Sequence, residues 1–133
     1  MGVSESPLNY TQSVSEESLK NELELGIRPE LFIIGKEDIV MFGLSVFFRH
    51  AGESILSYGV RLTYKVGGWD EMISKMSDEE IRKQTVMADI LVQAIGFVRG
   101  SMYVRTQNTP VSKLCLPTLS TKELQNNIII RKP

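Results

Sequence analysis

The sequence predicts an α+β protein, in which a four-stranded antiparallel sheet is followed by a long apolar helix and a short C-terminal helix. Two observations predict this class. Apolar and polar residues alternate through the first half of the chain, as they do in half-buried strands. In the second half, apolar residues recur at helical spacing between Thr85 and Tyr103. The 133 residues fit one domain spanning 1–133, with a flexible leader over 1–7 and a tail over 126–133.

Four alternating segments predict the strands. The first, over residues 8–15, is weak, and the second, over 19–27, places apolar residues on one face and charged residues on the other. The third and fourth segments lie around 40–48 and 56–66. A polar connector that contains a glycine, 49–54, joins them, and such a connector is typical of a hairpin.

The segment 28–37 connects the second and third predicted strands. Pro29 and Gly35 interrupt it, yet the four residues 31–34 are all apolar. We interpret the segment as a loop tucked into the core. The alternative is an apolar loop left exposed for a partner.

Local signals place the shorter helical segments. Ser77 followed by Glu80 fits a capping box, which predicts a helical turn over 78–83. After the long helix, Pro110 and Pro117 favour an extended backbone. Ser120 or Thr121 then provides the N-cap of a last short helix that contains Leu124.

The long helix is apolar on most of its circumference. Val86, Ile90 and Phe97 widen its main apolar stripe well beyond one side. A single sheet covers only one side of a helix, so we expect another copy of the chain to cover the rest. The residues expected at this oligomer interface are Leu91, Ile95, Val98 and Met102.

The composition argues against several classes of function. The net charge of −1 supplies no excess of cations for binding nucleic acid, and no apolar run reaches the roughly 18–20 residues of a membrane span. The single cysteine, Cys115, cannot form an intrachain disulfide, which is typical of a cytoplasmic protein. No spacing pairs Cys115 with the single histidine, His50, and no metal-ligating cluster occurs. We therefore expect no enzymatic activity, metal or cofactor.

The order of the predicted elements resembles that of the SecB-like export chaperones over about residues 8–125. The resemblance depends on the hairpin that ends in Gly67-Gly68 and Trp69, on the long apolar helix, and on the Leu-x-Leu-Pro segment 114–117 before the last helix. It implies a small α+β subunit that forms a homotetramer as a dimer of dimers. It also implies a holdase that binds unfolded or nascent polypeptides in apolar grooves without nucleotide hydrolysis.

The resemblance also implies which residues bind clients and partners. The implied client-binding residues are Phe32, Ile33, Ile34, Phe47, Trp69, Leu116 and Leu119. The export chaperones of this family dock on the SecA motor through an acidic sheet face, and other members serve toxin–antitoxin systems. In this chain the corresponding face carries Arg61 and Lys65 beside Glu22 and Glu24. The resemblance therefore implies that the partner is SecA or another protein such as an antitoxin.

Two further interpretations remain open. An oligomeric scaffold of the same fold would bind one specific folded partner and fill its apolar segments with its own subunits. A small-molecule pocket between sheet and helix would need converging polar groups, and the predicted inward strand faces offer few besides Tyr58 and Tyr64.

Overall fold

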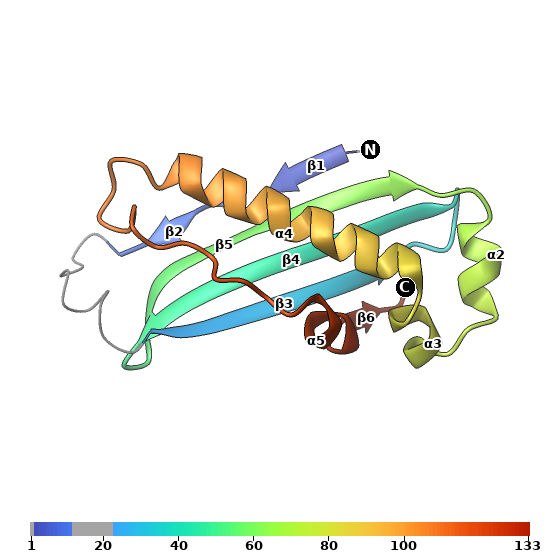
Figure 1. The fold of residues 1–133 in the computed structure, drawn as a ribbon. Helices are drawn as coiled ribbons and strands as arrows, with labels where there is room; N and C mark the ends of the chain where they lie inside the picture. Colours follow the sequence, from blue (N-terminus) through green and yellow to red (C-terminus); the bar gives the residue numbers. More distant parts are fainter. Residues whose placement is uncertain (1, 12–22) are drawn as a thin grey trace.

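The computed structural model describes residues 2–11 and 23–133 (Figure 1). Within them, six strands form one sheet: β1 (Gly2–Glu5), β2 (Asn9–Tyr10), β3 (Glu24–Ile33), β4 (Ile39–His50), β5 (Glu53–Lys65) and β6 (Ile129–Arg131). The helices are α2 (Trp69–Ser74), α3 (Asp78–Arg82), α4 (Thr85–Arg105) and α5 (Thr121–Asn126). The expected α+β class is confirmed.

The sheet is built around three long antiparallel strands. Its order is β1-β5-β4-β3-β6, and β2 pairs with the same edge of β5 as β1. β6 runs parallel to β3. Figure 1 shows α4 lying diagonally across one face of the sheet, with the C-terminal segment beside it. The fold is therefore two layers, with one face of the sheet uncovered by helices in the described part of the chain.

The hairpin of β4 and β5 is confirmed. Its turn is Ala51-Gly52, with φ angles of 49° and 81°. Two successive positive φ angles define the turn whose twist matches that of the flanking strands. The pairing then continues from His50↔Glu53 to Ile39↔Lys65, with one irregularity beside Phe48.

Several expected boundaries are wrong. Residues 2–5, expected in the flexible leader, form β1 on the edge of β5, and residues 129–131 of the expected tail form β6 on β3. The segment 28–33, expected in a loop, continues β3 opposite β4. Pro29 fits there because β6 pairs with β3 only from Glu30 onward, so β3 has a single neighbour at the proline. Residues 12–15 and 19–22 of the first two predicted strands lie outside the described residues.

A polar junction holds the short helix α2, which the sequence did not predict. The Asp38 carboxylate accepts hydrogen bonds from the backbone N–H groups of Gly68 and Asp70, at 3.1 and 3.0 Å. The Asp70 carboxylate accepts one from the Asp38 N–H at 3.0 Å. Asp38 therefore satisfies N–H groups at the start of α2 from a distant part of the chain. These N–H groups hold the pKa of Asp38 below its ordinary value.

The core fills the space between the sheet and α4. Alternate residues of β4 and β5 point to this side and are buried, whereas their neighbours are more exposed. The four residues expected at the oligomer interface, Leu91, Ile95, Val98 and Met102, lie in this core with exposed fractions of 0 to 7%. That expectation is wrong, because the chain's own sheet and C-terminal segment already cover these side chains.

The predicted capping box of Ser77 and Glu80 is present at α3.

Candidate functional site

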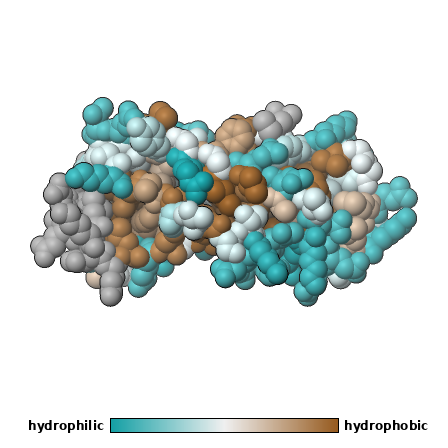
Figure 2. All heavy atoms as spheres, in the orientation of Figure 1, coloured by the Kyte–Doolittle hydropathy of each residue, from teal (hydrophilic) through white to brown (hydrophobic). Residues whose placement is uncertain are grey.

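The side of α4 that points away from the sheet carries exposed apolar side chains. Val92, Tyr103 and Val104 are 56, 65 and 67% exposed. Gly96 and Gly100 lie on the same side, and a Cβ built on either would meet no atom within 4 Å. We call these five residues the α4 outer face. Figure 2, seen from this side, shows patches of apolar residues along the middle of the molecule, with polar residues around them.

A hollow follows one flank of the α4 outer face. It has a volume of about 440 Å³ and lies between α4 and the C-terminal segment. Its apolar lining includes Ile95, Leu116 and Leu119. Arg99 closes part of the hollow by donating a hydrogen bond to the Pro117 carbonyl at 3.0 Å. We call this hollow the lateral groove.

The structure separates the seven predicted client-binding residues. Leu116 and Leu119 line the lateral groove. Trp69 is only 1% exposed and belongs to the core, and Ile33 packs against that core. Phe32 and Phe47 alternate with core-facing residues of β3 and β4, so they lie on the opposite side of the sheet. Ile34 is half-buried just after β3. The seven residues therefore do not form one groove.

The uncovered side of the sheet, which we call the far face, carries charge and aromatic rings. Arg61 and Lys65 of β5 share it with Glu24 of β3, as the docking prediction requires. Glu22, the fourth predicted docking residue, lies outside the described residues. The structure adds Arg28 and Arg49, which flank the ring of Phe47, whereas the sequence prediction had not placed either arginine on this face. The alternation of β3 and β4 could have revealed them.

A second polar cluster joins the N-terminal edge strand to α4. The Arg105 guanidinium donates a hydrogen bond to the Glu5 carboxylate, and this bond holds the pKa of Glu5 below its ordinary value. Arg105 also lies 5.8 Å from the centre of the Tyr58 ring. Burial raises the pKa of the Tyr58 hydroxyl. This cluster attaches the C-terminal end of α4 to β1 at the edge of the sheet.

The described residues contain no cluster typical of metal binding. Within them, no group of three His, Cys, Asp or Glu side chains is placed to hold a metal ion. His50 ends β4 at the hairpin, and Cys115 is exposed in the C-terminal segment. By length and composition alone α4 is able to cross a membrane, but core helices pass the same test, and one side of α4 is packed in the core.

No known family model matches the chain, and no curated protein matches it significantly. The molecule has two candidate binding surfaces, the α4 outer face with its lateral groove and the far face of the sheet.

Proposed function

We propose that the protein is a SecB-like chaperone subunit without enzymatic activity. It assembles into a cytoplasmic homotetramer and holds non-native polypeptides, for protein export or for a toxin–antitoxin system. The observation that carries this proposal is the apolar α4 outer face running beside the lateral groove. An apolar patch of this kind on a subunit marks a surface that another polypeptide covers.

The glycines of the α4 outer face support assembly through this helix. A glycine inside a helix costs roughly 1 kcal/mol of stability relative to alanine. No contact within the described chain requires Gly96 or Gly100 to lack a side chain, since the space beside each is open. Small residues four apart allow a second helix to approach closely, and side chains such as Val92 and Tyr103 then pack across the contact. The copy expected on α4 therefore lies on this face and not on the buried stripe.

The lateral groove supports the binding of extended apolar segments. Leu116 and Leu119 project from the C-terminal segment toward Ile95 of α4, so aliphatic side chains line both walls. Grooves of this kind recognise many sequences weakly, and several grooves in one assembly raise the total affinity. An oligomer with one groove per subunit would therefore hold an unfolded chain at several points.

The test measures how well the protein suppresses the aggregation of an unfolded client at stoichiometric amounts. Leu119→Asp places a charge in the groove at a half-buried position, and we expect it to lose most of the protection while the oligomer persists. Val92→Asp combined with Tyr103→Asp should convert the oligomer to monomers. The matched control is Gln107→Asp, at an exposed position just beyond α4. A wild-type protein that is monomeric, or that protects none of several clients, contradicts the proposal.

A second candidate is an oligomeric scaffold of the same fold that binds one specific folded partner. The far face favours it, because fixed charges beside aromatic rings suit one complementary surface better than varied apolar clients. Affinity capture separates the two functions. A single folded partner in fixed stoichiometry indicates the scaffold, and a heterogeneous set of nascent chains indicates the holdase.

A further inference from the structure

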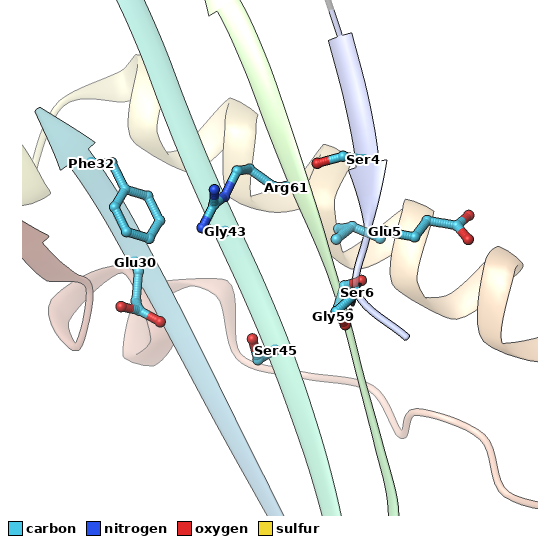
Figure 3. Close-up of a pocket in the computed structure, with 10 residues that line it drawn as sticks. Ser4, Glu5, Ser6, Glu30, Phe32, Gly43, Ser45, Gly59 and Arg61 are labelled. Carbon is cyan, nitrogen blue, oxygen red and sulfur yellow. Dashed lines mark hydrogen bonds between the residues drawn. The ribbon is translucent and has the colours of Figure 1, made fainter. Parts of the chain in front are cut away.

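The far face repeats one local arrangement twice. In each copy, an arginine guanidinium lies over a phenylalanine ring: Arg61 over Phe32 at 4.7 Å from the ring centre, and Arg28 over Phe47 at 5.2 Å. The Arg49 guanidinium lies 6.0 Å from the centre of the same Phe47 ring. Figure 3 shows Arg61 reaching from β5 across Gly43 of β4 toward Phe32 of β3. Stacking of this kind orients a guanidinium on its ring.

Glycines leave room for both arrangements. A Cβ on Gly43 would lie 3.4 Å from the Phe32 ring, and one on Gly26 would lie 3.8 Å from the Phe47 ring. At Gly59, a Cβ would come within 3.0 Å of the Leu44 carbonyl and the Ser45 hydroxyl. The sheet surface between the arginines therefore carries no side chain at these glycines. Two shallow hollows of about 280 and 240 Å³ open on this surface.

The far face carries an excess of positive charge among the described residues. Its cations are Arg28, Arg49, Arg61, Lys65 and Arg131, and its acids are Glu24 and Glu30. Glu30 already accepts a hydrogen bond from Arg131 at 2.9 Å. Glu24 lies directly opposite Arg49 in the register of β3 and β4. Arg28 and Arg61, one in each hollow, therefore remain as the oriented donors for anionic groups of a partner.

We propose that the far face binds an extended acidic segment of a partner protein, with one carboxylate seated in each hollow. The hollows lie at Gly43 and Phe47 along β4, and four residues of a strand span about 13 Å. An extended peptide places side chains i and i+4 on the same side at this spacing, so the fitting segment has acidic residues four apart. Specificity for an acidic partner follows from charge complementarity.

A protein segment fits better than a nucleic acid strand. Single strands are held by stacking bases on free aromatic faces. Here the guanidinium groups occupy ring faces of Phe32 and Phe47. Glu24 and Glu30 also stand among the cations and would repel a continuous run of phosphates. A peptide places only one carboxylate in each hollow, where the lining acid of the far face is Glu30, already bonded to Arg131, or Glu24, which lies opposite Arg49.

The experiment uses the full chain and a labelled ten-residue peptide with glutamates four positions apart, followed by fluorescence anisotropy. We expect the affinity for the peptide to fall as the salt concentration rises. We also expect the affinity to be at least tenfold lower in the double variant Arg28→Gln, Arg61→Gln. The matched control, Lys75→Gln with Lys122→Gln, removes two exposed charges elsewhere and should bind normally. Arg61→Lys, which keeps the charge but loses the planar stack, should weaken binding less than Arg61→Gln. Urea unfolding of each variant confirms that the fold persists.

Three outcomes would overturn the proposal. The peptide does not bind at millimolar concentration, the double variant binds as the control does, or a single-stranded oligonucleotide binds more tightly than the peptide. The inference is independent of the proposed chaperone activity. The double variant should protect unfolded clients as well as the wild type does, so failure of peptide binding and failure of client holding are separate results.

Discussion

Replacing both glycines of the α4 outer face by alanine should make the single chain more stable and the assembly weaker. At Gly96 and at Gly100 the added methyl group meets open space within the chain. Each substitution removes the cost of a helical glycine, so the pair should raise the free energy of unfolding of the dissociated chain by about 1–2 kcal/mol. This gain corresponds to a rise in Tm of roughly several degrees for a domain of this size.

The same methyl groups would stand between two helices that pack closely at these positions. We expect the association constant to fall at least tenfold, which is about 1.4 kcal/mol. Sedimentation over a dilution series measures the association, and urea unfolding at the lowest concentration measures the stability of the dissociated chain. General damage to the fold cannot raise stability, so the opposite signs provide an internal control. If the alanine protein associates as tightly as the wild type, or more tightly, the reasoning about close helix packing is refuted.

The other predictions concern the core, the sheet and pH. Leu91→Ala should lower the free energy of unfolding by roughly 2–5 kcal/mol at every protein concentration, because Leu91 is fully buried in its own chain. If the loss of stability instead depends on protein concentration, Leu91 lies at an interface between copies. Gly59→Ala should destabilise by roughly 1–3 kcal/mol because its methyl group would meet the β4 backbone, whereas Gly67→Ala, in open space, should be nearly neutral. Asp38→Asn tests the junction at α2. The folded pKa of Asp38 is lowered from 3.8, so the carboxylate contributes stability above that value and loses the contribution as the pH falls through the folded pKa. The difference in urea midpoint between wild type and Asp38→Asn should be full near neutral pH and should shrink on acidification below 3.8; a difference that stays constant in acid would show that the carboxylate charge is not responsible.

The elements that the sequence predicted correctly are those with a strong local pattern. The alternation of β4 and β5, the glycine-containing turn and the capping box at Ser77 each depend on residues close together in the chain. The stretch 28–33 was misread because Pro29 usually interrupts a strand, and only the late start of the β6 pairing makes it acceptable. The short strand β6 pairs with a segment about a hundred positions earlier, and no local pattern reports such a contact.

The candidate site was only partly predictable for the same reason. Periodicity identifies which residues of α4 are apolar, but it does not say which side the sheet covers. The C-terminal segment packs along α4 and buries side chains such as Ile95, and this left Val92 and Tyr103 as the exposed ones. The stacked arginines of the far face required the register of three strands, since Arg61 and Phe32 belong to β5 and β3 and meet across β4.

The two proposed surfaces lie on opposite sides of one sheet, and this placement has a consequence for how the protein works. Side chains of the far face and of the α4 outer face are separated by the sheet and its core, so a ligand on one surface does not touch the other. A partner docked on the far face therefore leaves the lateral groove free, and the protein should bind an acidic peptide and an unfolded client at the same time. Adding the labelled peptide to a preformed client complex tests this directly. The peptide affinity should stay within about twofold of its value for the free protein. Displacement of the client by the peptide would mean that the two ligands share a surface, and one of the two assignments would then be wrong.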